Sequence, residues 1–270
     1  MDPIPALRQS LAVCRRSLQA PAYPKHLVPR LLAQHQQQAC RSISTNPDTP
    51  RNVHSSNANP TETTKNSGND KTNTPPKKRM ALTPKQRDFL DSALRVNQAG
   101  ELAATLIYAA QTPPVTRSHP NLRPLMKHMY DQEAGHLTTF NTLLAKHRVR
   151  PTAMYPIWEV AATALGWSTG IMGREAAMAC TEAVETEIGT HYNDQVREIL
   201  EWFEDARERG EEPDDELVEL VGTLKRIRDE ELEHLDHAVE NDAKEAKPYD
   251  PLVSVIRLGC KAAIQISQRV

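Results

Sequence analysis

The feature that most constrains the fold of this chain is a Glu-x-x-His motif that occurs twice in segments of helical character. The stretch "YDQEAGHL" contains Glu133 and His136, and "RDEELEHL" contains Glu231 and His234. Residues three apart on an α-helix differ by roughly 60° of rotation, so each Glu and His share a face and can bind one ion. A single copy is common on solvated helix faces, but two copies in one helical domain are stronger evidence, since two such pairs on different helices could hold two ions. The decisive question is whether other helices supply two more carboxylates.

Two further carboxylates stand in apolar surroundings on other segments. Glu101 is the acidic residue of "RVNQAGELAATLIYAAQ", and Glu185 lies in "MACTEAVETEIGTHYND". A charged group in such a setting normally needs a partner or a metal ion. Glu182 shares the face of Glu185 and Glu187 is also near, so spacing alone leaves the choice on this segment open.

The order Glu, Glu-x-x-His, Glu, Glu-x-x-His is the ligand pattern of a carboxylate-bridged di-iron helical bundle. Four carboxylates balance two divalent ions, and oxygen and imidazole donors with open positions suit iron better than zinc. We expect Glu185 to act as a bridging carboxylate. Tyr192 follows it by seven residues, two helical turns, and His191 precedes Tyr192; a phenol there is a substrate contact or electron relay, or core packing.

The periodicity of the apolar residues predicts helices and no strands. Apolar residues recur three and four positions apart in 84–111, 121–147, 174–206 and 214–241, and Thr83 and Pro84 supply a helix start. The breakers "QTPPVTRSHP", "RVRPTAMYP" and "ERGEEPDD" separate these segments. The sequence predicts an all-α protein, a ferritin-like antiparallel four-helix bundle with one or two extra apolar, membrane-surface helices.

Residue composition divides the chain into three parts. Residues 1–43 are rich in arginine and hold a single acid, which is typical of a mitochondrial transit peptide, although a disordered basic tail is the alternative. Residues 44–80 form a disordered polar linker, and the ordered domain spans 81–270. Four scattered cysteines favour a reducing compartment, and a net charge of -2 gives no whole-chain reason to expect nucleic-acid binding.

Two almost uncharged segments predict contact with a membrane surface. Residues 156–173 include Glu159 and are marginal for a span, which needs roughly 20 apolar residues. They suit an interfacial helix with Trp158 and Trp167 as anchors, the alternative being a helix buried in the bundle. The segment "PLVSVIRLGCKAAIQISQRV" at the end can lie alongside it.

Five stretches resemble the demethoxyubiquinone hydroxylases of ubiquinone biosynthesis over about residues 87–270. They are "LRVNQAGELAATLIYAAQ", "DQEAGHL", "ACTEAVETEIGTHYNDQ", "RDEELEHLDHA" and "IRLGCKAAIQIS". The resemblance selects Glu185 over Glu182 and places His191 and Tyr192 beside the quinone. It implies these iron ligands: Glu101, Glu133, His136, Glu185, Glu231 and His234.

The resemblance also implies a reaction and its setting. One oxygen atom of dioxygen enters the 5-demethoxyubiquinol ring, which gives 5-hydroxyubiquinol, with NADH as the electron source. Because no dinucleotide-binding fingerprint is present, the electrons would arrive through the quinone or a partner. The implied partners are a lipid-binding ubiquinone-biosynthesis protein and a larger complex, on the matrix side of the mitochondrial inner membrane. The competing reading is a ferritin-like iron-storage or ferroxidase protein.

The sequence departs from this family in two places. Gln98 stands where the family usually has histidine. The second half of the repeat is also longer than the first, and we interpret the extra residues, near 203–219, as an acidic loop insertion at a hairpin tip, away from the metals.

Overall fold

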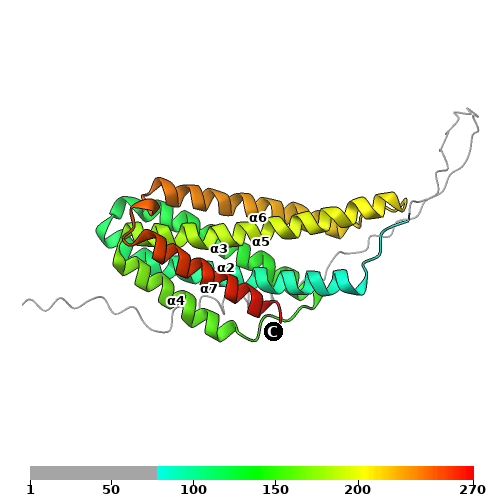
Figure 1. The fold of residues 1–270 in the computed structure, drawn as a ribbon, viewed down its shortest axis with the longest axis horizontal. Helices are drawn as coiled ribbons and strands as arrows, with labels where there is room; N and C mark the ends of the chain where they lie inside the picture. The colour runs from blue at the N-terminus through cyan, green and yellow to red at the C-terminus, as the bar shows by residue number, and fades with distance from the viewer. Residues whose placement is uncertain (1–77) are drawn as a thin grey trace, which may run out of the picture. The chain divides into compact units, whose positions relative to one another are not determined.

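The computed structural model describes residues 78–270, and this part is built from helices, as predicted (Figure 1). The transit-peptide prediction for residues 1–43 and nearly all of the linker prediction concern residues outside that range. In chain order the elements are α2 (Pro84–Ser118), η1 (Pro120–Leu122), α3 (Arg123–His147), α4 (Tyr155–Met172), α5 (Arg174–Glu208), α6 (Asp215–Glu240), η2 (Ala243–Glu245) and α7 (Tyr249–Ser267).

Helices α2, α3, α5 and α6 form the bundle, and its core consists of two apolar clusters. One cluster contains Leu94, Phe140 and Ile227, and the other contains Met129 and Met178. On each of the four helices, a predicted metal-ligand position lies between the residues that join one cluster and those that join the other. The predicted ligands therefore sit at mid-height in the bundle, with apolar packing above and below.

The start of α2 follows the prediction, but its end does not. Gln86 N–H donates to the Thr83 hydroxyl and Thr83 N–H donates to the Gln86 side chain, which forms a capping box with Pro84 in the first turn. The helix then continues through Pro113 and Pro114 to Ser118, where we predicted a break after residue 111. Tertiary packing explains the difference, because Val115 is buried in the apolar cluster that contains Met129 and Met178.

The predicted acidic loop insertion near 203–219 is wrong in form. Helix α5 runs to Glu208 and α6 begins at Asp215, so the extra residues lengthen the two helices and leave a short turn. Trp202 and Leu217 are buried there, which makes this end of the hairpin part of the core. The helical periodicity predicted over 174–206 and 214–241 is thus confirmed, and it conflicts with a loop over 203–219.

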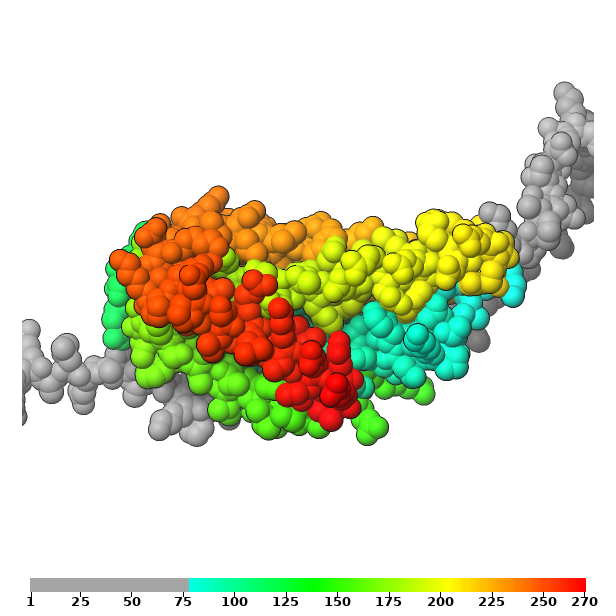
Figure 2. All heavy atoms as spheres, viewed as in Figure 1, coloured from blue at the N-terminus to red at the C-terminus, as the bar shows by residue number. Residues whose placement is uncertain are grey.

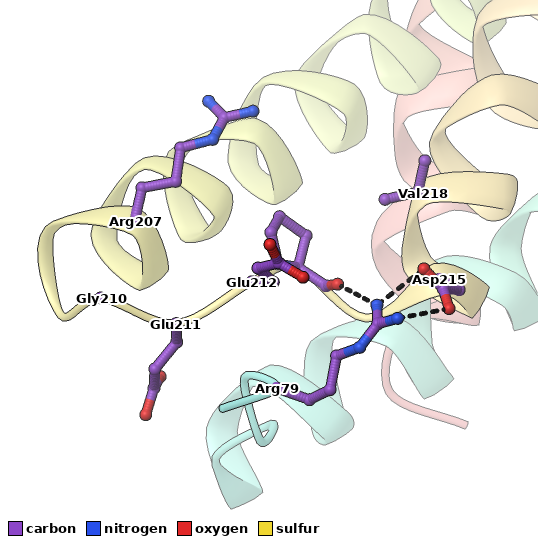
Figure 3. Close-up of a pocket in the computed structure, with 8 residues that line it drawn as sticks. Arg79, Arg207, Gly210, Glu211, Glu212, Asp215 and Val218 are labelled. Atoms are coloured by element: carbon purple, nitrogen blue, oxygen red, sulfur yellow. Dashed lines mark hydrogen bonds and ion pairs between the residues drawn. The ribbon is translucent and has the colours of Figure 1, made fainter. Parts of the chain in front are cut away.

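The chain before α2 is tied to this hairpin tip. The Arg79 guanidinium makes two hydrogen bonds to the Asp215 carboxylate, at 2.7 and 2.8 Å (Figure 3). Met80 N–H donates to the Glu212 carbonyl at 2.8 Å. The shallow pocket drawn there is lined by both charged and uncharged residues, and Arg79 and Asp215 form an ion pair across it. It shares no residue with the predicted metal site.

Helix α4 lies against α2 through two glycines. A Cβ atom at Gly166 would come within 2.5 Å of the Ile107 carbonyl oxygen, and one at Gly170 within 2.8 Å of the Pro114 ring. The sequence "GWSTG" thus permits backbone contact that any larger residue would prevent.

Helices α4 and α7 both lie on the face of the bundle shown in Figure 2, in green and red. Trp167 is 58% exposed, Val160 71% and Leu258 69%, so both helices present large apolar side chains to the outside. Trp158 is partly buried, and its indole N–H donates to the Ser267 hydroxyl at 2.9 Å, which ties α4 to the end of α7; its role as an anchor stays a prediction. Within residues 78–270, none of the helices is both long and apolar enough to span a bilayer.

Candidate metal centre

The six predicted ligands meet in the middle of the bundle and are buried, with at most 2% of each residue exposed. Their donor atoms form two groups in which all atoms lie within 4.8 Å of one another. Helices α2, α3, α5 and α6 each contribute, as the order of the motifs predicts. The first group is Glu101, Glu133, His136 and Glu231, and the second is Glu133, Glu185, Glu231 and His234.

Glu133 and Glu231 belong to both groups, so the carboxylates placed to bridge two ions are those of the two Glu-x-x-His motifs. Our expectation that Glu185 bridges is wrong, because Glu185 belongs to one group only. His136 Nδ1 lies 3.0 Å from Glu231 and 3.3 Å from Glu101. His234 Nδ1 lies 2.9 Å from Glu133.

The donor atoms that line the centre lack hydrogen-bond partners. Both carboxylate oxygens of Glu133 and of Glu231, and the Nδ1 atoms of both histidines, are buried without a hydrogen bond. Burial of so many polar atoms without partners is costly, and native proteins normally satisfy them. Two cations with open coordination positions would satisfy them, and four carboxylates match the charge of two divalent ions. The residues present therefore fit a pair of metal ions.

Each histidine is held at its outer nitrogen by a residue from the facing motif helix. His136 Nε2 lies 2.5 Å from a Glu230 oxygen, and His234 Nε2 lies 2.9 Å from the Gln132 side-chain oxygen. These acceptors place the ring proton on Nε2 and leave Nδ1 to face the centre, the arrangement typical of metal-bound histidine.

Two tyrosines complete the surroundings, one of which sequence reasoning missed. The Tyr108 hydroxyl donates to Glu185 at 2.9 Å, and the Tyr192 hydroxyl donates to Glu101. Tyr108 follows Glu101 by seven residues, just as Tyr192 follows Glu185. The repeat of that spacing was the available signal. Tyr108 of α2 thus contacts a carboxylate of α5, and Tyr192 of α5 contacts a carboxylate of α2. Tyr192 therefore lies at the centre.

His191 lies apart from the two groups. Burial lowers the pKa of its imidazole to about 4, and among the described residues its Nε2 has no hydrogen-bond partner. The structure therefore separates the two neighbours that we predicted together: Tyr192 contacts a candidate ligand, and His191 contacts none of them directly.

The competing acids of α5 have other partners. Glu182 accepts hydrogen bonds from Lys244 and from the Tyr249 hydroxyl, and Glu187 accepts one from Arg257 at 2.6 Å. Both acids thus hold the C-terminal segment against α5. Glu185 alone of the three points to the centre.

Burial and mutual charge set the protonation of the metal-free centre. Burial and the negative charge of Glu231 raise the pKa values of Glu133 and Glu185 well above their usual range. Burial opposes the ionisation of Glu231, but the nearby imidazoles of His136 and His234 prevail and lower its pKa to about 2. Likewise burial disfavours charged His136, but Glu101 and Glu231 raise its pKa to about 11. Metal ions would have to displace these protons.

Comparisons with known proteins show which family this chain is similar to. The family model for ubiquinone biosynthesis protein COQ7 matches residues 88–267. A Saccharomyces cerevisiae protein, "5-demethoxyubiquinone hydroxylase, mitochondrial", is 45% identical over 70% of this chain and 82% of its own length. A Bos taurus protein, "NADPH-dependent 3-demethoxyubiquinone 3-hydroxylase, mitochondrial", is 44% identical over 71% and 82%. A Rhodospirillum rubrum protein, "3-demethoxyubiquinol 3-hydroxylase", is 40% identical over 71% and 84%.

Proposed function

This chain belongs to the ubiquinone biosynthesis protein COQ7 family, and we propose that it hydroxylates demethoxyubiquinone at a pair of iron ions held by the core carboxylates. It is a demethoxyubiquinone hydroxylase, a monooxygenase of ubiquinone biosynthesis, as its relatives are. The observation that supports the metal assignment is the pair of four-donor groups that share Glu133 and Glu231.

In this proposal each residue of the centre has a definite task. Glu101 and His136 would hold one ion, Glu185 and His234 would hold the other, and Glu133 and Glu231 would serve both. When bound, the iron pair supplies the activation of dioxygen. The chain balances the charge of the ions, excludes bulk water and fixes both imidazoles through their outer nitrogens.

Hydroxylation inserts one oxygen atom of dioxygen into a ring C–H bond and reduces the other to water, which requires two electrons and two protons. We propose that these electrons come from NADH, or from NADPH, for which the Bos taurus relative is named. Tyr192 is then the substrate contact or relay nearest the centre, since it donates to Glu101. The predicted role of His191 beside the quinone requires the substrate to approach α5 from the side on which His191 lies.

The setting of the reaction is part of the same proposal. The substrate of the named relatives is a polyprenyl quinone, which resides in a bilayer, so the chain must reach the membrane. Helices α4 and α7 offer the exposed apolar side chains for this contact. We propose the matrix side of the mitochondrial inner membrane, as a peripheral protein, with a lipid-binding biosynthesis protein as partner.

The test combines metal analysis with isotope labelling. The purified full chain, reconstituted with Fe²⁺, should contain two iron ions that give the Mössbauer signature of a coupled pair. With demethoxyubiquinone and ¹⁸O₂, the new ring hydroxyl should carry one ¹⁸O atom. A chain that retains a single zinc ion and converts no quinone would refute the proposal.

A further inference from the structure

A second set of metal donors lies on the surface formed by α3 and α6. His128 from α3 and Glu233 and His237 from α6 each place one donor atom within 4.8 Å of the others. Glu233 Oε1 lies 3.6 Å from His237 Nε2, and the rings of His128 and His237 stand 6.4 Å apart at an angle of 75°. None of these residues belongs to the buried groups.

The separation of the donor atoms is close to the separation of ligands around a bound metal ion. Donors that bind a zinc ion tetrahedrally at about 2.1 Å lie about 3.4 Å from one another. The Glu233 to His237 separation is close to that value, and a donor atom of the exposed His128 lies within 4.8 Å of both. Two imidazoles from different helices also distinguish this site from an acidic patch.

The orientation of His237 agrees with metal binding. Its Nδ1 atom faces Glu240 at 3.8 Å, while its Nε2 atom faces Glu233. A carboxylate beyond the ring favours the proton on Nδ1 and leaves Nε2 free to coordinate. The same division of the two nitrogens, with their roles exchanged, occurs at the buried histidines.

We propose that His128, Glu233 and His237 bind one divalent first-row transition-metal ion, with water in the remaining position. Two imidazoles and one carboxylate suit Zn²⁺ or Fe²⁺ rather than Ca²⁺ or Mg²⁺, which prefer oxygen ligands. The ion joins α3 to α6, the two helices that carry the Glu-x-x-His motifs. The ion lies about one helical turn from Gln132 on α3 and from His234 on α6. It therefore stiffens the two helices whose hydrogen bond, between Gln132 and His234, orients the His234 imidazole.

The test counts ions in the full chain after chelator treatment. Zn²⁺ is titrated in competition with a chromophoric chelator, for the wild-type chain and for the His128→Asn and His237→Asn variants. We expect the wild type to bind one ion more than either variant, or to bind it at least about 10-fold more tightly. Co²⁺ absorption provides a second readout, since the variants should lose the bands of one low-coordinate site.

His147→Asn is the matched control. His147 is also a surface histidine that faces a carboxylate, Glu216, at 3.7 Å, but it belongs to none of the three-donor groups within residues 78–270. The control should bind as many ions as the wild type, and residues 1–77 are the same in every sample. Equal counts in wild type and both test variants would overturn the proposal, as would an equal loss in His147→Asn. Circular dichroism confirms that each variant is folded.

Discussion

The Tyr108 hydroxyl donates a 2.9 Å hydrogen bond to Glu185, which lies on a different helix of the bundle. Tyr192 does the same for Glu101, so each carboxylate that belongs to a single donor group is held by a tyrosine from the opposite helix. The centre therefore has an approximate twofold arrangement, in which the two halves of the repeat exchange their tyrosines. The predictions below follow from this arrangement and from the helices around it.

Tyr108→Phe should weaken metal binding at the Glu185 group about 10-fold, because a carboxylate loses the donor that orients it. Fe²⁺ affinity and kcat are measured together. Tyr130→Phe is the control, since its hydroxyl makes no hydrogen bond within residues 78–270 and lies outside the centre. Unchanged affinity in Tyr108→Phe would contradict a positioning role.

Glu185→Ala should abolish hydroxylation and reduce the iron content to about one ion per chain, because only one group loses a ligand. Glu182→Ala should retain both ions and most activity, since Glu182 contacts Lys244 and Tyr249 rather than the centre. Iron analysis and product formation distinguish the two variants. Equal losses in both would show that the ligand assignment on α5 is wrong.

Metal affinity should fall as pH falls from 8 to 6. Glu133 and Glu185 have raised pKa values and His136 has a pKa of about 11 in the metal-free chain, so binding must release protons. The free site binds more protons than the occupied site, and low pH therefore favours the free site. Each released proton weakens binding about 10-fold per pH unit. Calorimetric titration with Fe²⁺ in several buffers counts these protons, and an affinity independent of pH would refute the prediction.

Gly166→Val should destabilise the fold by about 1–3 kcal/mol, because its side chain would meet the Ile107 backbone and push α4 from α2. Gly222→Ala is the matched control. A Cβ atom there meets nothing within 4 Å, so helix propensity should make that change neutral or stabilising by up to about 1 kcal/mol. Urea denaturation measures both, and similar midpoints would argue against the close α2–α4 contact.

The double variant Val160→Glu and Leu258→Glu should bind lipid vesicles at least about 10-fold more weakly than the wild type, because two exposed apolar side chains are lost. Val218→Glu, at the hairpin tip, serves as the control: that side chain is also exposed but lies on neither α4 nor α7. Co-sedimentation with vesicles of mitochondrial lipid composition gives the answer. Loss of binding in the control alone would place the membrane contact elsewhere.

The sequence by itself determined the helical class, most helix bounds and the candidate ligands of the two Glu-x-x-His motifs. A Glu-x-x-His spacing fixes the rotation of two side chains about one helix axis, and the Thr83 and Pro84 start signal acts within one turn. Both are local properties, so reading the chain recovered them. The choice of Glu185 over Glu182 needed the family resemblance, because the two share a face.

Tertiary structure alone decided how the helices meet. Glu133 and Glu231 became the shared carboxylates, Glu230 and Gln132 crossed to the opposite histidines, and Tyr108 reached Glu185. The same packing carried α2 through Pro113 and Pro114. These outcomes depend on the axial register and relative rotation of different helices, which periodicity within one helix does not specify. The packing of the two apolar clusters on either side of the buried carboxylates and histidines sets this register and rotation.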